Sequence, residues 1–493
     1  MIIGPATTSC YTSIDFVLLF PELFLSTASL VLLVYGVVYS TSSWFTYPLL
    51  APNVGWLSVL CVVCALVLHC NAPATHAVLM YNSLVIDECT FFLKTLILGG
   101  AACAFVVSFD YFVRERMNAF EYAVLMLLST CSMLLLCSSY DLISMYLSIE
   151  LQSLCFYVLA ASKRDSEFST EAGLKYFILG AFSSGILLFG SSMMYGFTGT
   201  TNFEHLSHLA NTSNGVLIGM LFLAVGFLFK LTAAPFHMWA PDVYEGAPTA
   251  ITAFFAIVPK TAILGVFLRL FVCSLYDLLV PWQSILLMCS LLSMLVGSFA
   301  ALSQKKIKRL LAFSSVGHIG YMLMGMACGT VEGVQALLIY ICIYMLMTIN
   351  VFAFVLSLRG EDGRVKYISD ISVLSQTNPV LAITFALAMF SMAGVPPLAG
   401  FCSKFYVFFA AMSSSLYVLA FVGVLTSCVS CFYYIRMIKI MYFEKPVRWL
   451  VYSQVDMATS LLLGTTLACI VFFFAYPSPL FVSTHTVALA LCS

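Results

Sequence analysis

Long uninterrupted apolar runs constrain this chain more than any other feature of its sequence. Residues 216–229, for example, are apolar on nearly every helical face. Only 9% of the residues are Asp, Glu, Lys or Arg, against about 25% in a soluble domain, so the chain cannot cover a water-facing surface. In lipid, backbone polar groups are satisfied only within helices or closed barrels, and barrel strands would alternate over segments of about 10 residues. The runs are therefore predicted to be transmembrane helices.

Apolar windows of about 20 residues predict fourteen transmembrane spans. In chain order the predicted spans are residues 15–38, 54–70, 85–109, 119–138, 141–161, 173–196, 215–236, 249–272, 281–302, 307–328, 333–358, 379–412, 415–441 and 457–476.

The positions of lysine and arginine test this count independently. Fifteen of the 21 Lys and Arg residues follow the ends of odd-numbered spans, whereas the loops at 70–83 and 195–214, after even-numbered spans, contain none. By the positive-inside rule, the basic loops lie on the cytoplasmic-equivalent face and both termini on the opposite face. The fifteen are Arg114, Arg116, Lys163, Arg164, Lys305, Lys306, Lys308, Arg309, Arg359, Arg364, Lys366, Arg436, Lys439, Lys445 and Arg448.

Composition and motifs exclude several classes of function. A net charge of -1 with no basic tail gives no electrostatic footprint for nucleic acid. The 18 cysteines are scattered, and the pairs Cys61/Cys64 and Cys428/Cys431 each lack a second pair, so no metal or iron–sulfur site is expected. We find no secretory signal, transit peptide or Gly-rich nucleotide-binding turn. The chain is therefore not expected to bind a cofactor or to carry hydride chemistry itself.

Three lysines are predicted to lie deep inside the membrane. Lys230 lies in the seventh span, Lys260 in the middle of the eighth, and Lys404 in the twelfth. An ionisable side chain near the bilayer centre costs about 2.5–3.5 kcal/mol on insertion scales, so such residues normally face the protein interior and line ion paths. Glu150, in the middle of the fifth span, is the matching anion. These four residues are the candidate proton path.

The other intramembrane charges also have simpler explanations. Lys94 and Lys175 are close enough to span ends for their ammonium groups to reach the interface, although Lys175 remains a candidate for the path. Arg269 is expected to be an interfacial anchor, and Glu22 an interfacial group. His318, well inside the tenth span, is a candidate auxiliary because imidazole titrates near physiological pH, and a structural histidine is the alternative.

Prolines interrupt the spans that carry the three deep lysines. Pro235 follows the first lysine, Pro259 precedes the second, and Pro396 and Pro397 precede the third. Proline frees a backbone carbonyl, which membrane proteins tolerate only where protein or water lines the gap. Broken helices in corresponding places of two halves point to the ion path of a transporter. Spans 7 and 12 are five spans apart, an odd offset, so spans 4–8 and 9–13 are predicted to form an inverted repeat.

The segment 229–248, which contains Lys-Leu-Thr-Ala-Ala-Pro-Phe-His, closely resembles the signature of the chain 2 family of respiratory NADH:ubiquinone oxidoreductase (complex I). Segments 21–23, 314–321 and 394–401 are similar to that family too, and the resemblance runs along the whole chain. It implies an all-α, antiporter-like membrane protein of fourteen helices that moves protons while partner subunits oxidise NADH and reduce quinone. The family's charged axis falls on Glu150 and the three deep lysines.

The resemblance carries further expectations about residues, domains and partners. The auxiliary residues are Lys175, His318, His237, Pro235, Pro396 and Pro397. The domain is expected to comprise N-terminal helices (1–118), two repeats (119–272 and 281–441) and a C-terminal helix (442–493). FMN, iron–sulfur clusters and quinone are expected in partner subunits, and the contacts are other membrane-arm subunits, including neighbouring antiporter-like ones, and lipids. The expected location is the mitochondrial inner membrane, with both termini on the intermembrane-space side; a bacterial plasma membrane is the alternative.

Three other functions stay open at this point. A subunit of a multi-subunit cation/proton antiporter would share the fold and the Glu–Lys axis, but would transport sodium without NADH. A sister antiporter-like subunit of complex I would be identified by its neighbours in a purified complex. A purely structural spacer is the third alternative, and three deep lysines argue against it.

Overall fold

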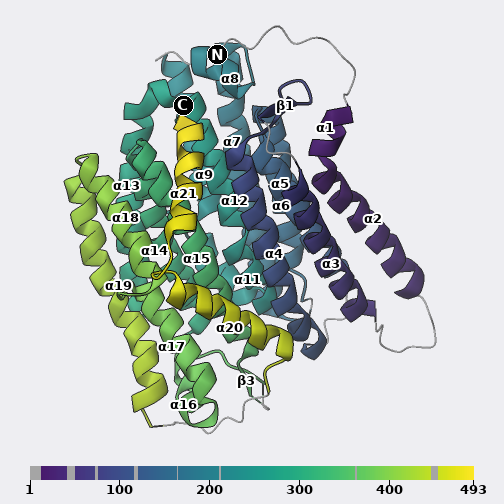
Figure 1. Ribbon diagram of the computed structural model, residues 1–493, viewed down its shortest axis with the longest axis vertical. Coiled ribbons are helices and arrows are strands. Elements are labelled where there is room, and N and C mark those ends of the chain that lie inside the picture. The colour runs from purple at the N-terminus through teal and green to yellow at the C-terminus, as the bar shows by residue number, and fades with distance from the viewer. Residues whose placement is uncertain are drawn as a thin grey trace.

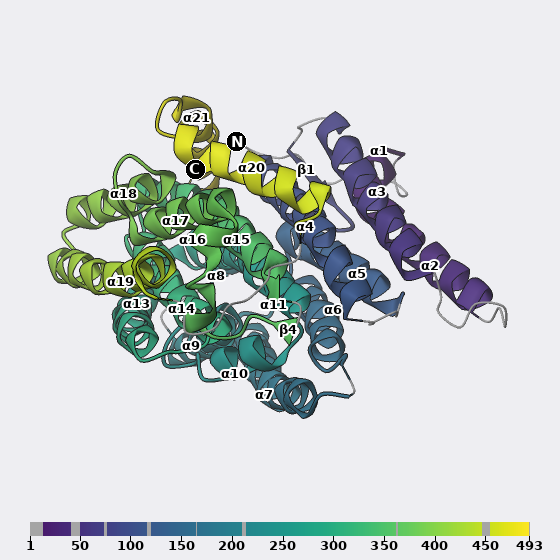
Figure 2. The same ribbon diagram turned by 90° about the horizontal axis from the view of Figure 1, so that it is seen from below.

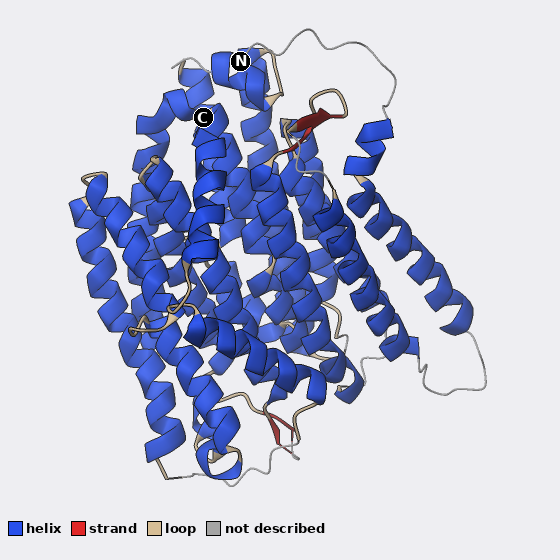
Figure 3. Cartoon of the chain, in the orientation of Figure 1, coloured by secondary structure: helices blue, strands red, loops and turns tan. Residues whose placement is uncertain are grey.

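The chain folds into a bundle of long helices with very little strand structure (Figure 3). A computed structural model describes residues 13–40, 50–72, 76–115, 120–163, 165–209, 213–360, 363–445 and 454–492. The positions of Arg116, Arg164 and Arg448, used above in the charge test, lie outside these described residues. The remaining twelve basic residues of that set are the ones whose end of the bundle the structure shows.

Helices account for the whole interior. They are α1 (Ser13–Leu18), α2 (Phe20–Ser40), α3 (Leu50–Asn71), α4 (Glu88–Arg114), α5 (Glu121–Ser138), α6 (Leu142–Ala160), α7 (Glu167–Thr198), α8 (Phe203–Leu209), α9 (Asn214–Leu231), α10 (Trp239–Gly246), α11 (Thr249–Ile257), α12 (Pro259–Leu268), the π-helix η1 (Arg269–Ser274), the 3₁₀-helix η2 (Tyr276–Leu278), α13 (Leu279–Leu302), α14 (Ile307–Ala327), α15 (Val331–Ser357), the 3₁₀-helix η3 (Ile368–Ile371), α16 (Leu374–Thr377), α17 (Pro379–Ala393), α18 (Ala399–Ser413), α19 (Tyr417–Phe443), α20 (Met457–Phe472) and α21 (Ser478–Cys492).

The helix count agrees with the predicted number of spans. Among the described residues, twelve helices are long and apolar enough to cross a membrane, and η1 continues the eighth of them. The shorter apolar helices form two consecutive pairs, α17 with α18 and α20 with α21. If each pair counts as one crossing, the described chain crosses fourteen times.

The helices at the centre of the bundle are more buried than those at its edges. Viewed from below, α15 and α11 lie in the interior, with α2 and α3 at one edge and α18 and α19 at the other (Figure 2). The segment α11–α12, α14 and α15 are almost entirely buried, whereas most of α2 and α3 is exposed. A helix that is apolar on all sides is stable only in such an interior or in lipid, and α15 meets that condition. Lys260, His318 and Tyr344 come from these buried helices, α12, α14 and α15.

The two ends of the bundle differ in charge, as the sequence predicts. Two short antiparallel hairpins mark them: β1 (Ala77–Leu79) with β2 (Leu84–Ile86) at one end, and β3 (Arg359–Gly360) with β4 (Gly363–Arg364) at the other (Figure 1). α8 and the end of α21 lie at the β1 end, and α16 lies at the β3 end. The described basic loops gather at the β3 end, where the backbones at Lys305 and Lys366 are joined by hydrogen bonds to the adjoining chain.

The final span differs from its prediction. Residues 457–476 were expected to form one helix, but α20 ends at Phe472 and α21 follows it. Pro477 explains the interruption because it cannot continue a helix and restricts the residue before it. Figure 1 shows α20 running obliquely across the bundle and α21 running toward the β1 end.

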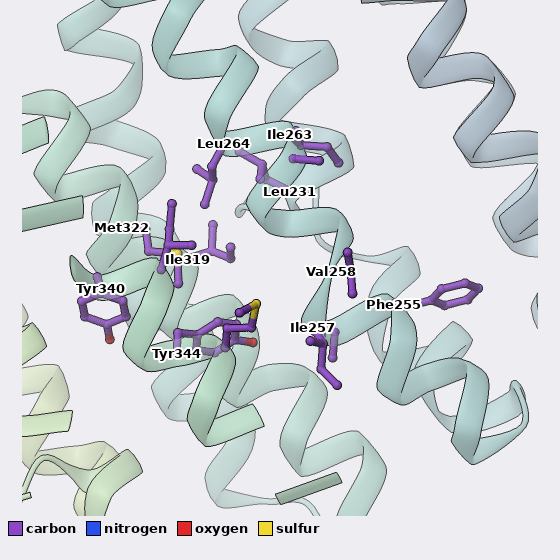
Figure 4. Packing of buried hydrophobic residues seen from close by; sticks show 14 of the residues in the cluster. Leu231, Phe255, Ile257, Val258, Ile263, Leu264, Ile319, Met322, Tyr340 and Tyr344 are labelled. Carbon is purple, nitrogen blue, oxygen red and sulfur yellow. The ribbon is translucent and has the colours of Figure 1, made fainter. Parts of the chain in front are cut away.

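Span 8 is also interrupted, which makes a third broken helix beside the two predicted ones. α11 ends at Ile257, and α12 begins at Pro259, directly before Lys260. Figure 4 shows Phe255 and Ile257 on one side of Val258, and Ile263 and Leu264 on the other. Lys260 therefore lies at the start of a half-helix, surrounded by apolar packing.

Candidate functional site: a row of lysines at broken helices

Span 7 breaks directly after Lys230. α9 ends because Thr232 adopts a left-handed conformation (φ 66°) and because Pro235, three residues later, cannot continue the helix. The indole Nε1–H of Trp239 donates to the carbonyl of Phe229 at 3.1 Å, which fixes the chain after the break. Lys230 is thus held in the last turn of a half-helix in the middle of the bundle.

The break in span 12 repeats this geometry 162 residues later. Gly394, with φ of 90°, ends α17 as Thr232 ends α9, and Pro397 takes the place of Pro235. Three backbone hydrogen bonds also correspond. In the first break, Thr232 N–H donates to the carbonyls of Leu228 and Phe229, and Ala233 N–H donates to that of Leu228. In the second, Gly394 N–H donates to the carbonyls of Phe390 and Ser391, and Val395 N–H donates to that of Phe390. α9 approaches its break from the α8 end and α17 from the α16 end (Figure 1). The two halves are therefore related as an inverted repeat.

The side chain of Lys404 reaches the second break from α18, the half-helix that follows it. Its ammonium donates to the carbonyls of Met392 (3.1 Å) and Ala393 (2.9 Å), the last residues of α17. Carbonyls at a helix C-terminus are unpaired and carry partial negative charge, so they stabilise a cation there. Met392 stands 162 residues after Lys230. The turn before the first break therefore carries Lys230 itself, and the equivalent turn before the second break binds the Lys404 ammonium.

Glu150 reaches Lys230 through hydroxyl groups. The ammonium of Lys230 lies 3.5 Å from the hydroxyl of Tyr157, and Ser153 Oγ donates to Glu150 Oε2 at 3.4 Å. Ser153 and Tyr157 lie one helical turn apart on α6. Glu150, the anion predicted to match the deep lysines, thus lies with Lys230 along one series of polar groups on α6 and α9. The series is Glu150–Ser153–Tyr157–Lys230.

Lys230 and Lys260 line one internal cavity of about 30 Å³. Gln152 and Thr232 line it as well, and the buried Gln152 Oε1 and Thr232 Oγ1 have no hydrogen-bond partner among the described residues. A cavity needs only about 10–15 Å³ of this kind of volume and two to four polar partners to hold a water molecule. The cavity is therefore large enough for a water molecule beside polar side chains from both lysine-bearing helices.

Lys260 contacts the second half through Tyr344. Its ammonium lies 3.3 Å from the Tyr344 hydroxyl. Figure 4 shows Tyr344 and Tyr340 one turn apart on α15. A smaller cavity of about 10 Å³ is lined by Tyr344, Ser314, Ser315, Thr348 and Met392, whose carbonyl binds Lys404. Hydroxyl groups therefore continue from Lys260 toward Lys404.

His318 joins the tyrosines of the second half. Its Nδ1 lies 2.8 Å from the Tyr340 hydroxyl, and its Nε2 lies 3.2 Å from the Tyr434 hydroxyl. The ring is buried, 5.2 Å from the Tyr344 ring, and within electrostatic reach of Lys260 and Lys404. Both ring nitrogens are thus engaged, and the histidine lies near both lysines.

The remaining auxiliary residues lie away from this row or at its edge. His237 is buried in the first break, where its Nδ1 has no hydrogen-bond partner among the described residues. Lys175 is part-exposed and pairs with Glu171 (2.7 Å) and Asp242 (3.0 Å). Asp242 also faces Arg309 at 3.7 Å across the two halves. Lys175 therefore belongs to an ion-pair network at the basic end.

Three charges near span ends are buried and paired between helices. Lys94 and Glu22 are both buried and lie 2.6 Å apart. Arg269 is buried as well, with its Nη2 donating to both Asp87 oxygens at 2.8 and 2.7 Å. The interfacial positions predicted for Glu22 and Arg269 stay predictions. A cation close to a span end can meet a carboxylate on another helix, and the spacing along one span cannot show that partner.

The sequence analysis also missed the tyrosines. Each deep ammonium lies over a tyrosine ring: Lys230 is 5.9 Å from the Tyr157 centroid, Lys260 5.4 Å from Tyr344, and Lys404 5.5 Å from Tyr321. The ring faces attract cations, and the hydroxyls can accept and donate protons. Tyrosines inside apolar spans could have predicted these contacts, because a buried hydroxyl needs a hydrogen-bond partner.

Comparison with known proteins decides the family. The model of the family described as NADH:quinone oxidoreductase/Mrp antiporter, transmembrane, matches residues 139–430. The NADH-ubiquinone oxidoreductase chain 2 of Marchantia polymorpha is 59% identical over 488 residues, which cover 97% of this chain and 99% of that protein. The chain belongs to the NADH-ubiquinone oxidoreductase chain 2 family. The resemblance inferred from the segment 229–248 is thereby confirmed.

Solved structures of membrane complexes share this fold. A chain in the respiratory complex I of Thermus thermophilus with bound aureothin is 27% identical, with a TM-score of 0.80 over 94% of this chain and 98% of that chain. A chain of the Mrp complex from Dietzia sp. DQ12-45-1b superposes with a TM-score of 0.83 over 98% of each chain. Its identity of 19% shows a shared fold alone.

Proposed function

We propose that the chain is a proton-translocating membrane subunit of respiratory NADH:quinone oxidoreductase, and that its protons move along Glu150, Lys230, Lys260 and Lys404. The observation that carries the proposal is the cavity shared by Lys230 and Lys260 between two broken helices. A structural spacer would gain nothing from lysines at such positions, because each costs free energy to bury. Family membership supports the same role, since the matching proteins are named for this enzyme.

Proton transfer along the row follows from the contacts. Burial disfavours the charged form of a lysine, and a carboxylate nearby restores it. A proton arriving near Glu150 weakens that support, so Lys230 releases its proton across the shared cavity to Lys260. The Tyr344 hydroxyl and the serine-lined cavity then lead toward Lys404. His318, near both Lys260 and Lys404, assists proton transfer between them. Lys175 acts at the basic end, and His237 acts in the first break.

The repeat boundaries and the location complete the proposal. The first repeat comprises residues 119–272 and the second 281–441, with helices 1–118 and 442–493 flanking them. The correspondence of the breaks at Thr232 and Gly394 supports this division. We place the chain in the mitochondrial inner membrane, with the basic loops on the matrix side and both termini on the intermembrane-space side. FMN, iron–sulfur clusters and quinone belong to partner subunits in this scheme.

An ion-exchange function is the second candidate, because the Mrp chain shares the fold. Sodium transport without NADH would identify that function. The deep cations are lysines joined by hydroxyls, and ammonium groups with hydroxyls relay protons more readily than they bind a metal cation. The lysine row therefore favours proton transport.

Lys230 provides the test of the proposed function. In the assembled complex, Lys230→Ala and Glu150→Ala should suppress proton pumping coupled to NADH oxidation. Lys230→Arg should fail as well, because guanidinium keeps its proton in proteins. Full pumping by any of the three variants, with normal assembly, would overturn the assignment. Lys445→Ala, on an exposed residue of the basic end, is the control and should pump normally.

A further inference from the structure

A second charged site lies in the N-terminal helices, apart from the lysine row. Glu22 in the first turn of α2 and Lys94 on α4 form an ion pair of 2.6 Å, with 4% and 3% of their side chains exposed. Lys94 lies seven residues after Asp87, hence two turns and about 10 Å deeper on the same face of α4. The pair is therefore inside the membrane-spanning part of the helices.

A neighbouring pair shows what a structural ion pair looks like in this region. Asp87 accepts from Arg269 at both oxygens and from the backbone N–H of Thr90 at 2.8 Å, and Arg269 Nη1 also donates to the carbonyl of Cys137. Guanidinium does not release a proton in proteins, and the carboxylate is well supplied with donors. The Asp87–Arg269 pair is therefore fixed in one charge state.

The Glu22–Lys94 pair differs on each of these points. The ammonium of Lys94 lies against one carboxylate oxygen, and no hydroxyl, amide or ring N–H of the described residues donates to either oxygen of Glu22. Both groups can exchange protons. The attraction within a buried ion pair offsets the cost of desolvating both charges only if further hydrogen bonds satisfy the remaining lone pairs, and Glu22 lacks such bonds. Stability alone therefore does not account for this pair.

The surroundings connect the pair with both the row and one end of the bundle. Gly265 of α12, the helix of Lys260, has no room for a Cβ against Leu93, which precedes Lys94, so α4 packs closely on the lysine-bearing helix. The Cys137 thiol is within electrostatic reach of Glu22, Lys94, Asp87 and Arg269. Asp87, at the β1 end, has 16% of its side chain exposed.

The other titratable groups around the pair are few. The ring of His69 on α3 is buried, lies within electrostatic reach of both Glu22 and Lys94, and its Nε2 is 3.1 Å from the carbonyl of Phe91. The thiol of Cys131 on α5 donates to the backbone carbonyl of Glu22 at 3.5 Å. No further carboxylate or cation is recorded against the pair among the described residues.

We propose that Glu22 and Lys94 form a second proton-exchanging site of this subunit, which communicates with the face opposite the basic loops. The ion pair takes up one proton on the carboxylate, giving a carboxylic acid beside an ammonium, and releases it again toward the β1 end. The added positive charge then disfavours the protonated form of Lys260 on the neighbouring helix, so release from the row and uptake at the pair are coupled. The inference rests on the proposed function of the lysine row.

The test uses variants of the assembled complex in membranes. Glu22→Gln removes the carboxylate that takes up the proton, and the double variant E22Q/K94M replaces the pair by an uncharged contact of similar size. Both should assemble, oxidise NADH and pump several-fold fewer protons per NADH. A pH-difference infrared spectrum, recorded without turnover, should show a carboxyl band that Glu22→Gln removes, whereas Asp87→Asn should leave that band in place.

The outcomes separate this inference from the proposed function. Normal proton stoichiometry in Glu22→Gln and in the double variant, or an infrared spectrum that Glu22→Gln leaves unchanged, would overturn the second site. Normal pumping in Lys230→Ala would overturn the lysine row instead, because the infrared measurement does not depend on pumping. Loss of the Glu22 band together with reduced stoichiometry supports the second site.

Discussion

The ammonium of Lys404 lies 3.1 Å from the carbonyl oxygen of Met392, the residue that stands 162 positions after Lys230. Lys230 precedes its break and Lys404 follows its own, so an alignment by residue type does not match them. The bound carbonyl nevertheless belongs to the turn equivalent to that of Lys230. In the first half a lysine is attached to the last turn of a half-helix, and in the second half a lysine from farther along the chain binds the unpaired carbonyls of that turn.

Gly394 should be indispensable for this arrangement. A Cβ at Gly394 would lie 3.3 Å from Lys404 Nζ and 3.1 Å from its Cδ, and the φ of 90° is strained for any residue with a side chain. We expect Gly394→Ala to cost about 1–3 kcal/mol of local strain and to displace the ammonium. Pumping should fall several-fold in assembled complex. Gly196→Ala is the control, because no atom lies within 4 Å of a Cβ there, and equal activity of the two variants would contradict the account.

Tyr344 should carry protons between the halves. Tyr344→Phe keeps the ring beside His318 but removes the hydroxyl that lies 3.3 Å from Lys260. We expect the pumping rate to fall on the order of a hundredfold, the low end of what a positioned proton-transfer group contributes. Tyr195→Phe, on the exposed surface of α7, should leave the rate unchanged. The measurement is proton uptake by vesicles during NADH oxidation, and a wild-type rate in Tyr344→Phe would remove this residue from the path.

Pro396 and Pro397 should keep span 12 open. Replacing both with Ala removes a penalty of about 3 kcal/mol per proline in a helix interior, so α17 should extend beyond Ala393. The extension would pair the carbonyls that now bind Lys404, and transport should slow while the complex still assembles. Unchanged pumping, or a loss explained entirely by failed assembly, would count against this role. Native electrophoresis of the complex separates the two results.

The sequence predicted the parts of this structure that depend on one span at a time. Apolar length predicted the spans, and Pro235, Pro396 and Pro397 predicted the breaks, because helix length and proline geometry are local properties. The final span was misjudged because the apolar helix α21, which follows Pro477, was not predicted. Charge placement likewise predicted which end of the bundle is basic.

Pairings between helices could not be predicted in this way. The Glu22–Lys94 contact joins α2 to α4, and Tyr344 reaches Lys260 from 84 positions away. Such contacts depend on how helices rotate and pack against one another, which no single span records. The candidate residues Glu150, Lys230, Lys260 and Lys404 were found because burial makes a charge conspicuous. Their tyrosine partners were missed because a tyrosine inside an apolar span has an ordinary packing role.

Repulsion among the lysines is the central claim. Two unit charges 4 Å apart repel by about 4 kcal/mol at an effective dielectric of 20, and by about 2 kcal/mol at twice that distance. Lys230, Lys260 and Lys404 share the interior with Glu150 as the one carboxylate of the path. They should therefore never all be protonated together, and each arriving proton should displace the next one along the row.

Lys260→Met tests that claim most directly, because Lys260 borders both the cavity of Lys230 and the hydroxyl of Tyr344. Methionine removes the charge while filling similar space. In assembled complex, proton pumping should be lost, while infrared difference spectroscopy should still detect proton uptake at Lys230 in the first half. Normal pumping by Lys260→Met, or independent titration of the three lysines near their solution value in the unaltered protein, would contradict the account.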